Sequence, residues 1–304
     1  MQRFLPARLR LTDDTAPREE FWDWRGHRVH LDRYADPAAK AKVVLHHGVG
    51  TNGRQMSLIL GAPLAARGFE TVALDNLGYG LTQVEPGSTP SYDDWVDLVV
   101  DFLAHEQSRD DRPIVLYGLS AGGMLTYHVA AKAPRGTLAG IVGMTFLDQR
   151  DQRVRDETAH DRLTARLGGP VMGLLARTPA AFVTLPMSLA SKMSALANDR
   201  AAMKVFMKDR TSAANRVSVR FLDRYMNYVP AVEPEDFDAC PVLLTQPAED
   251  RWTPHHLSVP VLSRITKVPV ETVMLDNAGH YPLEEPGLQQ MQDAIADFVT
   301  RRTA

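Results

Sequence analysis

The sequence predicts an α/β protein with a mostly parallel central sheet, helices on both faces of that sheet, and a helical cap inserted late in the chain. Two observations predict this class. Short apolar runs alternate with longer helical patterns through most of the chain, as strands and helices do in parallel sheets. Between residues 150 and 230 this alternation stops, and the pattern is helical throughout, broken by glycine and proline.

The predicted strands of the first half are short, apolar and bounded by turn residues. Residues 21–24 and 27–34 are expected to pair as antiparallel strands around the turn Arg25-Gly26. Further buried strands are predicted at 42–46, 70–75, 113–117 and 138–147. Helices are predicted at 57–67, from Ser91 onward, and at 124–131.

The alternation resumes after residue 230. Strands are predicted at 241–245 and 270–275, and helices near 256–265 and at 288–301. The chain is therefore expected to divide into a core made of residues 1–149 and 231–304 and a cap made of residues 150–230. Ligands of such sheets bind at the carboxyl ends of the strands, so the cap is expected to lie over them as a lid.

The composition excludes several classes of protein. A net charge of −3 argues against a nucleic-acid partner, and no apolar run approaches the length that a membrane span requires. The single cysteine, Cys240, excludes an intramolecular disulfide and fits a reducing compartment. The first residues have no apolar segment of the kind found in secretion signals. A cytoplasmic protein is expected, and the oligomeric state is left open.

Charge is unevenly distributed along the chain. Residues 150–230 contain 14 Lys and Arg against 7 Asp and Glu, a net of +7, and six of the twelve methionines. Such a balance is usually a solvated helical face, but it also suggests steering of anionic substrates. Most apolar residues of this segment are expected to form its own small core, and a minority to line an adaptable pocket. They are Val171, Met172, Leu174, Leu175, Phe182, Leu185, Met187, Leu189 and Met193.

A serine stands between a predicted buried strand and a predicted helix. Gly118, Ser120 and Gly122 form the pattern G-x-S-x-G in the stretch YGLSAGG. This arrangement is typical of a nucleophile elbow, a sharp turn that exposes the serine hydroxyl and leaves no room for side chains two residues away. The alternative is an ordinary serine at the start of a helix, and the rest of the chain has to decide between the two.

A serine hydroxyl needs a base to remove its proton, and the base needs a carboxylate to hold it in position. Behind a nucleophile elbow these partners follow the serine in the order acid, then histidine, each after a strand. Asp250 follows the strand predicted at 241–245, and His280 follows the strand predicted at 270–275. The sequence therefore predicts a catalytic set of Ser120, Asp250 and His280.

The reaction also needs two backbone N–H groups for the oxyanion. Ala121, directly after the serine, is expected to supply one. The other is expected from Val49 in the loop His47-Gly48-Val49-Gly50, where the glycines leave the backbone free to turn toward the site.

With these elements the chain resembles the α/β-hydrolase superfamily from about Phe21 to Arg301. The segment that begins at Asp75 resembles the superfamily's D-x-x-G-x-G-x-S loop, with Thr82 in place of the serine. The HGVG and NAGH segments resemble the branch that contains monoacylglycerol lipases and carboxylesterases. The resemblance implies Ser120 as nucleophile, Asp250 as acid, His280 as base, Val49 and Ala121 as oxyanion donors, and no cofactor. The chain departs from the pattern before the acid, where Gln246-Pro-Ala replaces a glycine-containing turn.

Other candidates for the site stay open at this point. Asp148 follows the strand predicted at 138–147 and is the alternative acid, while Glu249 is a weaker one. His46 is expected to pack beneath the oxyanion loop. His255 and His256 are expected to be solvated, and no third ligand at a suitable spacing completes a metal site with them.

The predicted function is cleavage of carboxylic esters through an acyl-enzyme on Ser120. The substrate is expected to be a small apolar or monoacyl ester, and the basic segment adds an anionic ester as a hypothesis. The alternatives are an aminopeptidase or a lactonase of the same fold, or a receptor of this fold that binds a small ligand with little turnover. An aminopeptidase needs acidic groups to hold a substrate ammonium, and the basic cap disfavours it.

Overall fold

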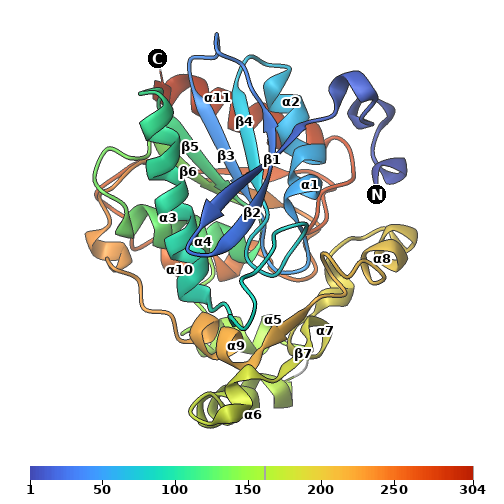
Figure 1. Cartoon of the computed structure of the whole chain (residues 1–304), viewed down its shortest axis with the longest axis vertical. Helices are drawn as coiled ribbons and strands as arrows, with labels where there is room; N and C mark the ends of the chain where they lie inside the picture. Colours follow the sequence, from blue (N-terminus) through green and yellow to red (C-terminus); the bar gives the residue numbers. More distant parts are fainter. Residues whose placement is uncertain (161, 304) are drawn as a thin grey trace.

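A computed structural model describes residues 1–160 and 162–303 (Figure 1). Its centre is an eight-stranded sheet in which β2 runs antiparallel to both β1 and β4, and the remaining neighbours are parallel. The predicted α/β class with a mostly parallel sheet is therefore confirmed. In sheet order the strands are β1 (Arg18–Trp24), β2 (His27–Tyr34), β4 (Glu70–Leu74), β3 (Lys42–His46), β5 (Ile114–Gly118), β6 (Gly140–Gly143), β9 (Val242–Pro247) and β10 (Val270–Leu275).

Helices cover both faces of this sheet. The Tyr117 hydroxyl of β5 donates to Met291 Sδ on α11 (Gly287–Thr303), while a Cβ on Gly118 would collide with Gly122 of α4 (Ala121–Lys132). Successive residues of a strand point to opposite faces, so α4 and α11 lie on opposite sides of the sheet. α3 (Tyr92–Arg109) packs beside α4, and α2 (Ala62–Ala65) packs beside α11.

The helix predicted at 57–67 is only partly correct. The helical region begins earlier, with α1 (Gly53–Met56), and the predicted stretch itself consists of the π-helical segment η4 (Ser57–Gly61) and α2. Pro63 has no N–H to donate to the preceding turn, so a regular helix would leave the Ile59 carbonyl unpaired. The side chain of Gln292 on α11 donates to that carbonyl instead, at 2.9 Å.

The strand predicted at 138–147 is shorter than expected and ends at Gly143. The chain then leaves the sheet, and its polar groups find other partners: Met144 N–H donates to the Gly118 carbonyl, and Phe146 N–H donates to Ser258 Oγ. The helix predicted near 256–265 is likewise reduced to η8 (His255–Leu257) and α10 (Val259–Leu262). The apolar pattern located both segments but not their ends.

The segment between β6 and η7 lies beyond one end of the sheet (Figure 1) and is not entirely helical as predicted. β7 and β8 form a separate antiparallel pair, in which Leu185 stands opposite Val217. Leu185 precedes Pro186, a position that favours extended backbone. The elements are α5 (Gln152–Thr158), α6 (Arg162–Leu175), η5 (Pro179–Phe182), β7 (Thr184–Pro186), α7 (Met187–Ala190), η6 (Met193–Ala195), α8 (Arg200–Phe206), β8 (Arg216–Ser218) and α9 (Val219–Met226).

Short 3₁₀ turns complete the described chain. They are η1 (Gln2–Phe4), η2 (Ala7–Leu9), η3 (Asp13–Thr15) and η7 (Pro234–Asp236). Among the helices of residues 1–160 and 162–303, none is both long enough and apolar enough to span a bilayer.

Two buried histidines make the fold sensitive to acid. Burial lowers the pKa of both His46 and His128 from 6.5 to about 3. Below pH 6.5 these histidines are protonated in the unfolded chain but stay neutral in the folded protein. The free energy of unfolding therefore decreases as the pH is lowered from 6.5 to about 3. The loss for each histidine rises from about half of 1.4 kcal/mol per pH unit at pH 6.5 to nearly all of it at pH 5. The pair therefore removes about 3 kcal/mol over this range, a large part of a typical stability.

Urea unfolding between pH 7.5 and pH 5 measures this loss. His128→Gln keeps a polar partner for the Tyr92 hydroxyl, which contacts His128 Nδ1 at 3.0 Å, and should lower the pH slope by about 1 kcal/mol per pH unit near pH 5. The exposed His255 offers the control, since His255→Gln should leave the slope unchanged. Equal slopes in the wild type and His128→Gln would contradict the prediction.

Candidate active site

Ser120 occupies a strained turn between β5 and α4. Its backbone has φ of 57° and ψ of −126°, a left-handed conformation that side chains other than glycine rarely adopt. The flanking glycines are required by packing. A Cβ on Gly118 would collide with the Gly122 carbonyl, and a Cβ on Gly122 would lie 2.8 Å from His46 Cε1. The serine at the start of α4 is thus held in an elbow and does not act as a side-chain cap.

The structure brings Asp250 and His280 together at the ends of neighbouring strands. Asp250 follows β9, His280 follows β10, and their Oδ2 and Nδ1 atoms are 2.9 Å apart with both side chains buried. Thr253, which the sequence analysis did not single out, joins them. Its hydroxyl lies 2.8 Å from Asp250 Oδ2 and 3.1 Å from His280 Nδ1.

The Asp250 carboxylate is held in its charged form. Its second oxygen, Oδ1, accepts hydrogen bonds from the backbone N–H groups of Trp252 and Thr253, each at 2.8 Å. Burial alone would raise the pKa of Asp250, but its electrostatic interaction and hydrogen bond with the His280 ring, together with the hydrogen bonds from Thr253, bring that pKa down to about 2. An aspartate side chain often accepts hydrogen bonds from the backbone N–H groups two and three residues later in a turn. This spacing, read from Asp250, is the sequence signal that could have located Thr253.

In the proposed chemistry the atoms that exchange a proton are Ser120 Oγ and His280 Nε2. Within residues 1–160 and 162–303, neither Ser120 Oγ nor the buried His280 Nε2 makes a hydrogen bond, including one to each other. Trp252 and Thr253 link them. Both line the same cavity as Ser120, the Trp252 ring packs on the His280 ring at 4.7 Å, and Thr253 contacts its Nδ1. Catalytic hydrogen bonds are often long or absent before substrate binds.

The predicted oxyanion loop packs directly against the elbow. A Cβ on Gly48 would lie 2.5 Å from the Leu119 carbonyl and 2.9 Å from Ala121 N, so only glycine fits there. Val49 and Ala121 both line the cavity, and neither N–H donates a hydrogen bond to any described residue. These two donors are therefore free for a ligand oxygen.

His47 fixes the shape of that loop. Its Nδ1 lies 2.7 Å from the Gly48 carbonyl, and its Nε2 accepts from Asn76 N–H at 3.0 Å. Nδ1 consequently carries the proton. Burial lowers the pKa of His47, so the ring stays neutral. The Asn76 side chain also donates to the His47 carbonyl, a contact between distant segments that sequence patterns did not reveal.

The loop that begins at Asp75 supports the same region. The buried Asp75 carboxylate accepts hydrogen bonds from Gly53 N–H and Leu81 N–H, and a Cβ on Gly80 would collide with it. Thr82 donates to the Asp75 carbonyl at 2.8 Å and accepts from His30 N–H at 2.9 Å. The Thr82 hydroxyl makes both bonds at the position where the resembled pattern has serine.

The alternative acids are engaged elsewhere. Asp148 forms an ion pair with Arg150 at 2.7 Å, and Arg150 also pairs with Glu233 at 2.7 Å. Burial would raise the pKa of Asp148, but its hydrogen bonds with Arg150 lower that pKa overall. The Glu249 side chain is exposed. Of the three carboxylates, the one hydrogen-bonded to His280 in the described structure is Asp250.

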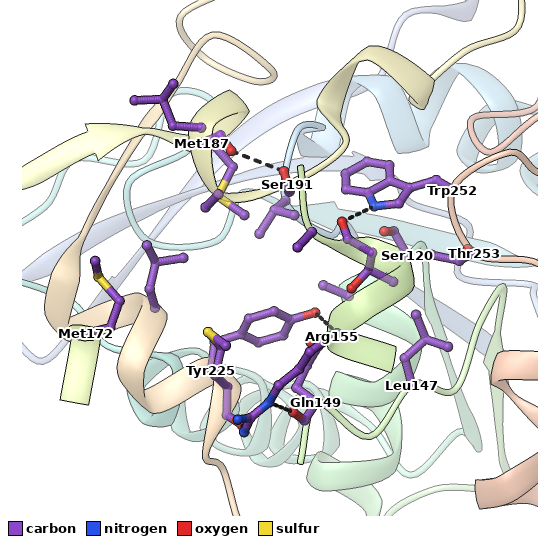
Figure 2. A pocket seen from close by; sticks show the side chains of 18 of the residues that line it. Ser120, Leu147, Gln149, Arg155, Met172, Met187, Ser191, Tyr225, Trp252 and Thr253 are labelled. Atoms are coloured by element: carbon purple, nitrogen blue, oxygen red, sulfur yellow. Dashed lines mark hydrogen bonds between the residues drawn. The ribbon is translucent and has the colours of Figure 1, made fainter. Parts of the chain in front are cut away.

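A cavity of about 200 Å³ opens above Ser120, and residues from the elements between β6 and β9 form most of its wall (Figure 2). Four of the nine apolar cap residues named from the sequence line it: Met172, Leu185, Met187 and Leu189. Met193 instead packs over the oxyanion loop, because a Cβ on Gly50 would lie 2.6 Å from its Sδ. The lining is mainly apolar, with a polar group formed by Gln149, Arg155 and Tyr225.

The segment around η6 contacts the loops on either side of the cavity. The Leu196 carbonyl accepts from Tyr281 N–H at 2.8 Å, next to His280. The Asn198 side chain donates to the Glu249 carbonyl at 3.1 Å, next to Asp250. Through these contacts and Met193, the segment touches the oxyanion, acid and histidine loops together.

One group of side chains in the described chain is close enough to hold a metal ion. Glu19, His30 and Asp32 place ligand atoms within 4.8 Å of one another. The Arg54 guanidinium already binds both carboxylates, at 2.6 Å from Glu19 and 2.5 Å from Asp32. The positive charge of Arg54 is therefore already paired with Glu19 and Asp32, and the three acidic and histidine side chains form part of an ion-pair network.

Comparison with known proteins identifies the family of this chain. Residues 37–287 match the Hydrolase_4 family, described as "Serine aminopeptidase, S33". The chain belongs to this family. Its fold is the α/β-hydrolase fold, as the resemblance implied. A search of curated proteins found no match.

Solved structures share the fold at low sequence identity. A soluble variant of monoglyceride lipase from Saccharomyces cerevisiae, in complex with a substrate analog, superposes with a TM-score of 0.76 and 17% identity over 99% of each chain. The monoacylglycerol lipase of Paleococcus ferrophilus gives 0.69 and 18%, over 90% of this chain and 99% of its own. Est1E from Butyrivibrio proteoclasticus gives 0.58 and 15%, over 93% and 98%.

Proposed function

We propose that this family member is a serine hydrolase that cleaves small carboxylic esters. The observation that carries the proposal is the free hydroxyl of Ser120, held on a strained elbow in the same cavity as two unpaired backbone N–H groups, those of Val49 and Ala121. Together they provide a nucleophile and a site for developing negative charge. The buried pair Asp250–His280 supplies the base.

The proposed reaction has two stages. His280 Nε2 takes the Ser120 proton as Oγ bonds to the ester carbon, and the carbonyl oxygen becomes an oxyanion held by Val49 and Ala121. The proton then passes to the leaving alcohol as the C–O bond breaks, which leaves an acyl-enzyme. Water attacks that acyl group in the same way, with His280 as base, and releases the acid. Asp250 keeps Nδ1 of His280 protonated throughout.

The proposal extends to the organisation of the chain. Residues 1–149 and 231–304 form the catalytic core, and residues 150–230 act as a lid. The contacts of Leu196 and Asn198 with the histidine and acid loops support this assignment, as do the cap side chains in the cavity wall.

The cavity favours short apolar esters over peptides. Its described lining contains Arg155 but no Asp or Glu, so nothing there would hold the ammonium of an aminopeptidase substrate. Its volume of about 200 Å³ lies below the roughly 300–1,000 Å³ of pockets for drug-sized ligands. Two of the similar solved structures support an ester substrate, since one is a monoglyceride lipase and the other a monoacylglycerol lipase.

A substrate panel tests the proposal. We expect kcat/KM for p-nitrophenyl butyrate to exceed that for p-nitrophenyl palmitate at least about tenfold, because the longer chain does not fit. A monoacylglycerol, a lactone and an aminoacyl anilide complete the panel. Faster cleavage of the anilide than of every ester would contradict the proposal. A single stoichiometric release of p-nitrophenol without steady turnover would indicate a receptor.

A further inference from the structure

A positive charge lines the cavity without an acidic partner. Arg155 of α5 donates from Nε to the Gln149 carbonyl at 2.5 Å, and from Nη2 to the Met226 carbonyl at 2.7 Å and to Asn227 Oδ1 at 3.2 Å. All three acceptors are neutral. Within residues 1–160 and 162–303, Arg155 forms no ion pair and its Nη1 makes no hydrogen bond. The charge of this guanidinium is therefore not compensated by the described chain.

A second unpaired donor lies beside it. Gln149 Nε2 donates to the Tyr225 hydroxyl oxygen at 3.2 Å, so the phenolic hydrogen needs another acceptor, and none is present among the described residues. Burial raises the pKa of Tyr225 well above its usual value, which keeps this hydrogen in place. Figure 2 shows Arg155, Gln149 and Tyr225 grouped on one side of the cavity that Ser120 also lines.

We propose that Arg155 and Tyr225 bind a carboxylate carried by the substrate, at the far end from the ester group that Ser120 attacks. This inference rests on the proposed function and names its substrate class: monoesters of short dicarboxylic acids, with the apolar chain against the methionines and leucines of the cavity. One cation and a neutral donor match a single negative charge. The apolar surroundings strengthen that interaction, because less water screens it.

Arg155 also has a structural use, and the test has to separate the two roles. Its bonds to the Met226 carbonyl and Asn227 tie α5 to the end of α9. Loss of this tie would lower stability and affect all substrates alike. Recognition of a carboxylate would affect the anionic ester specifically, so the informative quantity is the selectivity between matched anionic and neutral esters.

The experiment compares pairs of methyl esters of equal length. Monomethyl succinate, glutarate and adipate are each paired with the neutral ester in which a methyl group replaces the carboxylate. In the wild type we expect at least one anionic ester to exceed its neutral partner in kcat/KM. Arg155→Gln should lower that ratio by about 10- to 100-fold, as expected for a charge-assisted hydrogen bond. Tyr225→Phe should lower it by a smaller factor.

The matched control is Arg177→Gln. Arg177 is an exposed arginine of the same segment, and it lies outside the lining of this cavity. Arg177→Gln removes one positive charge, as Arg155→Gln does, and should leave the ratio of kcat/KM between anionic and neutral esters unchanged. An equal fall in both variants would mean that the overall charge of residues 150–230 attracts anions, and would overturn the assignment to Arg155. An unchanged ratio in Arg155→Gln would overturn it as well, and ester hydrolysis dependent on Ser120 would still stand.

A binding measurement keeps the inference testable without turnover. Calorimetry with succinate, glutarate and adipate, the dicarboxylate products, should show that at least one binds to Arg155→Gln about tenfold or more weakly than to the wild type. Equal affinities of the two proteins, or no binding of any of the three to the wild type, would overturn the inference. Failure of every ester in the panel would instead remove the proposed hydrolase function.

Discussion

Ser120→Ala is expected to lower kcat for p-nitrophenyl butyrate by about 10⁵- to 10⁶-fold, the scale on which loss of a serine nucleophile acts in hydrolases. The reason is chemical, because the proposed nucleophile is the hydroxyl that the elbow holds in the same cavity as the two free N–H groups of Val49 and Ala121. Stopped-flow release of p-nitrophenol measures the effect. The wild type should show a burst of acylation followed by steady turnover, and the variant should show neither.

The same residue predicts a separation of activity from stability. The left-handed backbone of Ser120 is strained in any residue with a Cβ, so alanine should leave the melting temperature nearly unchanged. Glycine removes that strain, so Ser120→Gly should be inactive yet more stable than the wild type by about 1–2 kcal/mol. Thermal unfolding of the three proteins measures this order.

A second serine in the cavity provides the control. Ser191 lines the same wall, and its hydroxyl donates to the Met187 carbonyl at 3.1 Å. Ser191→Ala should change kcat by less than about tenfold, since that hydroxyl is already paired. Comparable losses in Ser120→Ala and Ser191→Ala would show that the cavity, and not the elbow, determines the rate.

The sequence predicted best where one local pattern determines the structure. The strands predicted at 42–46, 70–75 and 241–245 correspond to β3, β4 and β9, which are buried along their whole length and rich in apolar residues, as strands of a parallel sheet are. The elbow was readable because its glycine pattern is local, and a Cβ on Gly118 would collide with Gly122 only four residues away. The second constraint, between Gly122 and the distant His46, was not visible in the sequence. Strand-end placement also explains why Asp250 and His280 could be expected to meet, since β9 and β10 are neighbours.

Prediction failed where the deciding partner lies far along the chain. The π-helical segment η4 depends on Gln292, more than two hundred residues beyond Ile59. β7 and β8 pair across the whole of α7 and α8, and neither strand is long enough to show a period of its own. Asn76 acts through a side-chain contact with the His47 carbonyl that no spacing rule encodes, and Arg155 was visible only as part of a net charge.

Asp250→Asn is expected to lower kcat by about 10⁴-fold, which is the cost of holding a catalytic histidine in the wrong tautomer. Asp250 Oδ1 accepts two backbone N–H groups, so the asparagine oxygen takes that position and its amide NH₂ faces His280. Nδ1 must then accept a hydrogen bond, and the ring proton moves to Nε2. A protonated Nε2 in a neutral ring cannot take the proton of Ser120.

Asp148→Asn is the matched replacement at the alternative position, and it should change kcat by less than about threefold. Asp148 neutralises Arg150, which retains Glu233 as a partner after the substitution, so no charge is left buried alone. Because the pKa of Asp250 is about 2, its carboxylate stays charged across pH 5–9, and the contrast between the two variants should hold throughout that range. A large loss of activity in Asp148→Asn with normal activity in Asp250→Asn would identify Asp148 as the acid. His280 would then have to leave its hydrogen bond with Asp250 and bind the Asp148 carboxylate, which is paired with Arg150 in this structure.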